Sequence, residues 1–188
     1  MRTNIYMRRI AIHQSYLFPH KGYFDLIKSA DVFVLYDDAQ YIKAGYINRN
    51  NFPEPFTFRL KKHSNYDKIN ECYFYDIHDD VVNFELKFPS LNHKYLGLLK
   101  QEDNLAVNIE RTVRAICKDL HITTPIYRSS DIKHGKFYHG VIDMVKALGG
   151  DTYINASGGR KLYTQKMFGD IKLKFLDTVA GPSILCEL

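Results

Sequence analysis

The sequence has no tryptophan and only three cysteines, Cys72, Cys117 and Cys186, among its 188 residues. These cysteines form no CxxC motif and no cluster with histidine, so the usual signatures of a disulfide framework and of a zinc site are both missing. We therefore expect free thiols in a reducing compartment.

Long apolar runs are missing as well. No stretch approaches the roughly 20 apolar residues that cross a bilayer. The basic N-terminus lacks the apolar core and the cleavage site of a signal peptide. There is also no internal repeat, low-complexity segment or interdomain linker. The sequence thus predicts a cytoplasmic protein with no membrane span and a single domain over residues 1–188.

The sequence has a small excess of basic over acidic residues, with a formal net charge of +5. The basic residues are scattered rather than gathered in one arm, so this balance permits phosphate-bearing ligands, such as sugar nucleotides or nucleic acid, and equally suits an ordinary surface. Fourteen tyrosines supply rings with polar tips, which suit the lining of a wet pocket.

Strand and helix patterns alternate at both ends of the chain. Residues 9–12 and 32–36 predict strands on either side of a helix at 22–29, an order that implies a parallel pair with a right-handed crossover. The run "VFVLY" (32–36) is apolar throughout, which is typical of a strand covered on both faces. The later segments "PIYRS", "TYINA" and "KLKFL" predict strands separated by helices at 137–148 and at a short stretch ending at Phe168.

The middle of the chain is less regular. "FTFRL" (56–60) and residues 69–75 are strand candidates, and 81–95 is predicted to be helical with a break near Pro89. Apolar residues recur at helical spacing from Leu105 to Leu120, which predicts an amphipathic helix. The whole pattern predicts an α/β fold, a single domain with a mostly parallel open sheet flanked by helices.

Polar residues follow four of the predicted strands. Ligands of open parallel sheets bind outside the carboxyl ends of the strands, where loops meet helix N-termini that favour anions. The residues at these ends are His13 and Gln14; Asp37 and Asp38; Ser129, Ser130 and Asp131; and Asn155 to Gly159.

Three of these residues have side chains suited to acid–base chemistry. His13 is a candidate general base, because imidazole titrates near neutrality, although a backbone group at a strand end can also satisfy a histidine. Asp37 and Asp38 point to opposite sides of an extended chain, and Gln40 shares the face of Asp38. Adjacent carboxylates can bind Mg²⁺, which is therefore the candidate cofactor, or orient a nucleophile, and they also end strands without further function.

Two further segments suit anions. In "NRN", Arg49 lies between Asn48 and Asn50, and a guanidinium binds carboxylate or phosphate in a bidentate fork; the alternative is a capped turn before a proline. "SGG" (157–159) lacks the spacing of a phosphate loop, and its glycines also suit a tight turn. Lys161 and Tyr163 follow, where an anion would be held.

Short motifs extend over most of the chain. They are His13-Gln14, Tyr16-Leu17, Pro19, Gly22-Tyr23-Phe24-Asp25, Asp31-Val32-Phe33-Val34, Asp37-Asp38-Ala39-Gln40-Tyr41, Asn48-Arg49-Asn50, "TTPIYRSSDI" and "LGGDTYINASGGRKLY". With these motifs the sequence resembles the WbqC-like family of bacterial proteins, most specifically in its first quarter.

This resemblance implies a function in surface-polysaccharide synthesis, particularly of the O-antigen of lipopolysaccharide. It implies a transferase that attaches an acyl or aminoacyl group, such as glycyl, to an amino sugar, with a nucleotide-linked sugar and an acyl donor as partners. The implied catalytic residues are His13, Asp38, Gln40 and Arg49. The implied substrate-binding residues are Gln14, Tyr16, Tyr23, Asp37, Tyr41, Asn48, Asn50, Ser129, Ser130, Tyr153, Asn155, Ser157, Gly158, Gly159, Lys161 and Tyr163; no metal ligands are implied.

Other functions stay open. The basic balance also suits a protein that binds or modifies nucleic acid. "PHKGY" resembles the HxGH motif of nucleotidylyltransferases, but Tyr23 stands at the second histidine position, which removes a phosphate donor. A noncatalytic sugar-nucleotide-binding protein is a further alternative. The relatives usually continue past the last strand into a longer tail, so we expect either an altered substrate or a wall borrowed from a neighbouring subunit of a homo-oligomer.

Overall fold

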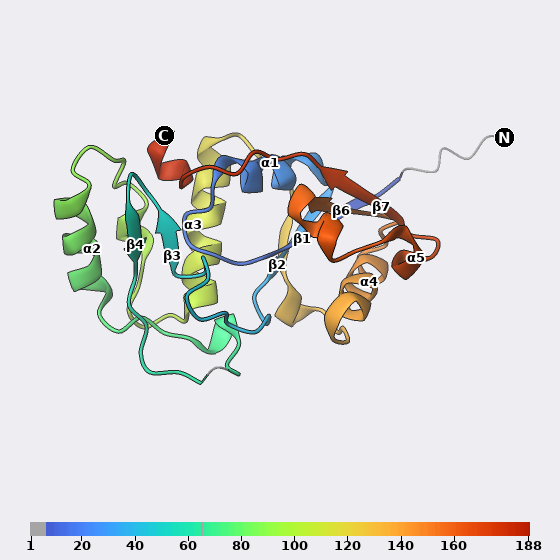
Figure 1. Ribbon diagram of the computed structural model, residues 1–188, viewed down its shortest axis with the longest axis horizontal. Coiled ribbons are helices and arrows are strands. Elements are labelled where there is room, and N and C mark those ends of the chain that lie inside the picture. Colours follow the sequence, from blue (N-terminus) through green and yellow to red (C-terminus); the bar gives the residue numbers. More distant parts are fainter. Residues whose placement is uncertain (1–6, 65) are drawn as a thin grey trace. The chain divides into compact units, whose positions relative to one another are not determined.

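The computed structural model describes residues 7–64 and 66–188 (Figure 1). Within them the chain divides into two compact units. Unit 1 comprises residues 7–13, 25–36 and 123–178, and unit 2 comprises residues 14–24, 37–64, 66–122 and 179–188. The single domain expected over residues 1–188 stays a prediction.

Unit 1 contains a five-stranded sheet in the order β5-β2-β1-β6-β7. Its strands are β1 (Arg9–Gln14), β2 (Val32–Tyr36), β5 (Ile126–Arg128), β6 (Thr152–Ala156) and β7 (Lys172–Leu176). The pairs β1 with β6, β2 with β5, and β6 with β7 are parallel. Together with the helices below, this sheet confirms the predicted α/β class and the mostly parallel open sheet.

The helices of this part of the chain are α1 (Lys21–Ser29), α4 (Phe137–Ala147) and α5 (Gln165–Phe168). Apolar side chains from both sheet and helices form one buried cluster: Ile10, Ile12, Val32, Val34, Tyr153, Val141, Met144, Val145, Phe168 and Ile171. The alternate residues Ala11, Phe33 and Leu35 are buried on the other face. The apolar run of β2 is therefore covered on both sides, as predicted.

An ion pair joins the starts of β1 and β2. The Arg9 guanidinium lies 2.7 Å from Asp31 Oδ1, and the Arg9 backbone N–H donates to Asp31 Oδ2 at 2.8 Å. The side-chain hydrogen bond from Arg9 lowers the pKa of Asp31. This contact fixes the chain at the two points where parallel strands begin.

Unit 2 contains little regular structure. Its elements are the antiparallel pair β3 (Arg49–Asn51) and β4 (Pro55–Thr57), α2 (Ile77–Lys87) and α3 (Leu105–Asp119). Its core is rich in phenylalanine rings that meet mostly edge to face or tilted, while Phe58 and Phe84 are stacked. The rings are those of Phe18, Phe52, Phe56, Phe58, Phe74, Phe84 and Phe88.

Three expectations for this middle region need correction. Only the first part of "FTFRL" is a strand, because the Arg59 N–H turns to the Asp80 carboxylate at 2.6 Å. Residues 69–75 form a 3-10 turn at Ile69–Glu71 and isolated bridges in place of a strand, since Glu71 Oε2 accepts from the Lys68 N–H. The helix expected at 81–95 begins earlier, capped by Asp76, and ends before Pro89.

Candidate functional site

The strand order of unit 1 reverses between β1 and β6. Strands β2 and β5 lie on one side of β1 in the sheet, and strands β6 and β7 lie on the other side. Ligands of open parallel sheets bind outside the carboxyl ends of the strands at such a reversal, because the loops there diverge. The last register pair of these two strands is Ala11 with Ile154, two residues before His13 and Ala156. His13 is half-buried. The end of β1 and β6 is therefore the candidate site of unit 1.

The turn after β6 is packed tightly against the end of the strand. Asn155 is 8% exposed, and its Oδ1 accepts from the Ala156 N–H at 2.8 Å. A Cβ placed on Gly159 would lie 2.3 Å from Asn155 Nδ2, whereas a Cβ on Gly158 would meet nothing within 4 Å. Both glycines belong to the 3-10 turn Ser157–Lys161. Glycine is needed at 159, because the turn lies against the Asn155 side chain there, and it is not needed at 158.

Two predicted tyrosines lie beside this strand end with different surroundings. Tyr153 is buried, stacks on Phe168, and its hydroxyl donates to the Ile12 carbonyl at 3.5 Å. Tyr163 is half-buried and meets the Tyr153 ring edge to face at 5.8 Å. Burial raises the pKa of both phenols, which therefore stay protonated at neutral pH.

Of the remaining predicted residues of unit 1, Ser129 and Ser130 follow β5, whereas Lys161 ends the turn after β6. Ser129 is fully buried, whereas Ser130 and Lys161 are exposed. Near the end of β2, the rings of Tyr36 and His134 meet edge to face at 5.7 Å. His134 was not expected from the sequence, because it lies in a segment with no strand or helix pattern.

The other predicted residues belong to unit 2. They are Gln14, Tyr16, Tyr23, Asp37, Asp38, Gln40, Tyr41, Asn48, Arg49 and Asn50. The predicted catalytic set is thus divided between the units, with His13 in unit 1 and its predicted partners in unit 2. The expected proximity of His13 to Asp38 and Arg49 stays a prediction.

The acidic pair lies along the segment 68–70. Asp37 is 2% exposed; its carbonyl accepts from the Asn70 N–H at 3.0 Å and its carboxylate from Asn70 Nδ2 at 3.4 Å. The Asp38 carboxylate lies 3.7 Å from Lys68 Nζ, and Gln40 forms a backbone bridge with Lys68. These contacts hold the pair in a defined loop.

The two asparagines of "NRN" support irregular backbone. Asn48 Oδ1 accepts from the Tyr41 hydroxyl at 2.7 Å, and its Nδ2 donates to the Phe58 carbonyl at 2.7 Å. Asn50 Nδ2 donates to the carbonyl of Phe18 at 2.6 Å, and Phe18 has a positive φ of 47°. These bonds account for the burial of both amides, and the one to Phe18 stabilises an uncommon backbone conformation.

Arg49 differs from its neighbours. It is half-buried, and within the described residues its guanidinium makes no ion pair or hydrogen bond. Its cross-strand partner is Thr57. Directly opposed residues of an antiparallel pair project from the same face, so Arg49 and Thr57 share a face of this hairpin.

Tyr16 and Tyr23 are core residues of unit 2. Their rings meet edge to face at 5.0 Å, and the Tyr23 hydroxyl lies 3.4 Å from the Gln14 carbonyl. Burial raises the pKa of both phenols. Both hydroxyls therefore stay protonated at neutral pH, and that of Tyr23 donates to the Gln14 carbonyl.

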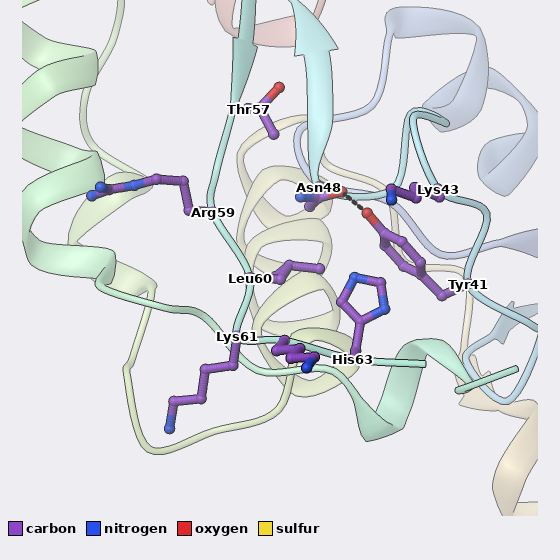
Figure 2. Close-up of a pocket in the computed structure, with 9 residues that line it drawn as sticks. Tyr41, Lys43, Asn48, Thr57, Arg59, Leu60, Lys61 and His63 are labelled. Carbon is purple, nitrogen blue, oxygen red and sulfur yellow. Dashed lines mark hydrogen bonds between the residues drawn. The ribbon is translucent and has the colours of Figure 1, made fainter. Parts of the chain in front are cut away.

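A pocket of about 400 Å³ lies in unit 2 (Figure 2). Its lining residues are Tyr41, Lys43, Asn48, Thr57, Arg59, Leu60, Lys61, Lys62 and His63. Only Tyr41 and Asn48 of these were expected from the sequence. The available signal was the run "KKH" (61–63) just after a strand candidate, which the scattered distribution of lysines elsewhere made inconspicuous.

Neither a metal centre nor a membrane helix is found in the part of the chain that the structure describes. No three histidine, cysteine, aspartate or glutamate side chains gather there as metal ligands. None of the described helices has the length and apolar character to cross a bilayer.

The fold makes this an α/β protein with a polar carboxyl edge on a mostly parallel sheet. The WbqC-like protein family matches residues 14–182, and the chain belongs to that family. It is similar to the uncharacterized protein Rv1507c of Mycobacterium tuberculosis (strain ATCC 25618 / H37Rv), with 25% identity over 89% of this chain and 80% of that protein. No solved structure matches the chain significantly.

Proposed function

We propose that this member of the WbqC-like family is a cytoplasmic transferase that joins an acyl or aminoacyl group, such as glycyl, to the amine of a nucleotide-linked amino sugar. Its product would enter surface-polysaccharide synthesis. One observation carries the proposal: the strand order reverses between β1 and β6, and a histidine stands in β1 at its carboxyl end.

The reaction needs a base and a site for negative charge. The amine nitrogen bonds to the carbonyl carbon of an activated donor, a thioester or an ester, while its proton passes to His13. The bond from that carbon to the leaving group then breaks, and the leaving group receives the proton from His13. A histidine suits both transfers because its unperturbed pKa lies near neutrality.

The other roles follow the chemistry of each side chain. Lys161 and the turn at Gly158 and Gly159 hold a carboxylate or phosphate of the substrate. Arg49 serves the same purpose, and its lack of an ion pair within the described residues supports this role, because a half-buried guanidinium gains from an anionic partner. Asp38 orients the base or the amine, and Gln14, Gln40 and Asn48 act as hydrogen-bond donors.

The test begins with a thermal-shift screen. The panel contains UDP-linked amino sugars, acyl and aminoacyl thioesters, and Mg²⁺, because a compound that binds only the folded protein raises its melting temperature. Compounds that shift the melting temperature are then combined, and N-acylated sugar is detected by mass spectrometry. We expect a product heavier by the acyl group.

A matched pair of variants tests the role of the base. His13→Gln should lower turnover on the order of a hundredfold or more, because general base catalysis is lost. His78→Gln is the control, since His78 is exposed on α2 of unit 2. Wild-type turnover in a folded His13→Gln protein, or no product from any pair in the panel, would overturn the proposal.

A further inference from the structure

The pocket of unit 2 is lined by basic side chains. Lys43, Arg59, Lys61, Lys62 and His63 line it, and no aspartate or glutamate does. Its volume of about 400 Å³ lies within the range of small-molecule sites. A concave surface of one charge sign concentrates ions of the opposite sign, so the expected ligand is a small anion.

Two of these cations already have partners. The Arg59 guanidinium binds the carboxylates of Asp79 and Asp80. Lys61 lies over the Tyr73 ring, with its Nζ 6.0 Å from the ring centroid. Figure 2 agrees, since the ends of Arg59 and Lys61 are directed away from Tyr41 and His63.

Lys43 and Lys62 are different. Within the described residues neither makes an ion pair or a hydrogen bond. Arg49, which also has no such partner, projects from the hairpin face that carries the lining residue Thr57. Two lining cations thus have no protein counter-charge among the described residues, which suits a ligand with more than one negative charge.

The floor of the pocket is fixed by hydrogen bonds. The Tyr41 hydroxyl donates to Asn48, which donates to the Phe58 carbonyl, and the Tyr41 N–H donates to the Asp67 carbonyl at 2.8 Å. The rings of Tyr41 and His63 meet edge to face at 4.5 Å. His63 Nδ1 lies 3.2 Å from the Ser64 carbonyl, a contact that helps to orient the imidazole ring.

We propose that this pocket binds the diphosphate group of a small nucleotide-type molecule, with Lys43 and Lys62 as the phosphate contacts. Leu60 and the ring of His63 supply the apolar wall that a base or sugar needs. A pocket of about 400 Å³ favours a small molecule over a duplex, which requires an extended basic surface. The inference does not rest on the transferase proposal, because binding of a diphosphate is measured without turnover.

The experiment measures affinity by isothermal titration calorimetry with the full chain. The probes are inorganic pyrophosphate, UDP, uridine and a single-stranded 12-nucleotide DNA. Pyrophosphate and UDP should both bind, and uridine, which lacks phosphate, should bind far more weakly. The double variant Lys43→Gln/Lys62→Gln should lose on the order of tenfold or more in affinity for both anions, because charge-assisted hydrogen bonds are lost.

The control removes the same charge elsewhere. Lys146→Gln/Lys166→Gln changes two exposed lysines of unit 1 and should leave the affinity for pyrophosphate within about twofold, and melting temperatures verify folding of both variants. Equal losses in the two double variants would overturn the proposal, since net charge alone would then explain binding. So would the absence of pyrophosphate and UDP binding at millimolar concentration, or binding of the DNA alone with a steep dependence on salt.

Discussion

The two units bury polar side chains for different purposes. In unit 1 the buried polar residues Ser129, Thr152 and Asn155 stand at the starts or ends of strands. In unit 2, Asn48, Asn50 and Asn108 are buried because they bind main chain that belongs to no sheet or long helix. The burial of these unit 2 amides is therefore explained by the main chain that they bind.

Asn108→Ala should have the largest effect on stability and would sharpen this comparison. Asn108 Oδ1 accepts from the Lys100 N–H at 2.7 Å, and its Nδ2 donates to carbonyls of Lys100, Asp103 and Asn104. Removal of the amide leaves buried main-chain groups without partners, so we expect a loss of about 2–4 kcal/mol in unfolding free energy. Urea denaturation measures this loss.

Asn83→Ala is the matched control, because Asn83 is exposed on α2. It should change the unfolding free energy by about 0.5 kcal/mol or less. If both variants unfolded at the same urea concentration, buried amides would not be what stabilises the irregular backbone of unit 2.

Gly159→Ala tests the packing at the end of β6 in unit 1. The new Cβ would lie 2.3 Å from Asn155 Nδ2, and Asn155 is held by its bond to the Ala156 N–H. We expect a loss of about 1–3 kcal/mol, typical of overpacking. Gly158→Ala should cost far less, because its Cβ would meet no atom within 4 Å. Equal stability of the two variants in thermal unfolding would contradict this geometry.

Removal of the ion pair between Arg9 and Asp31 should have the smallest effect on the unfolding free energy. The lowered pKa of Asp31 means that its contribution to stability is complete above the ordinary carboxyl pKa of about 3.9 and is lost as pH falls through the folded-state pKa. Both side chains are about two-fifths exposed, so solvent screening limits the contribution to about 0.5–1 kcal/mol.

The variant Asp31→Asn should therefore be slightly less stable than the wild type at pH 7, and the difference should shrink in strong acid. Asp170→Asn is the control, because Asp170 is exposed. If the difference in unfolding free energy between wild type and Asp31→Asn grew toward low pH, the ion pair would not be what stabilises the protein at neutral pH.

Elements with a local sequence pattern were predicted better than segments that are held by distant contacts. The apolar run of β2 and the helical spacing from Leu105 to Leu120 depend on neighbours within a few residues, and both elements were found. "FTFRL" also has apolar residues at alternate positions. Its Phe56 and Phe58 pack with Phe84, in a cluster that extends from Phe18 to Phe88, and such distant partners leave no local pattern.

The sequence also predicted only part of the candidate sites. Residues at strand ends, such as His13 and Asn155, follow from the rule for parallel sheets, and the structure has both in strands of that sheet. The pocket of unit 2 was missed because Lys43 and Lys62 are separated in sequence and resemble ordinary surface lysines. Their lack of acidic partners becomes visible only once the fold is known.

The most direct test of the central claim is a titration of isotopically labelled protein with the UDP-linked amino sugar that gives the largest thermal shift, followed by amide NMR shifts. The amides of His13 and of residues 155–161, at the reversal between β1 and β6, should shift with one common dissociation constant. Saturable binding that leaves all of these amides unmoved would contradict the claim.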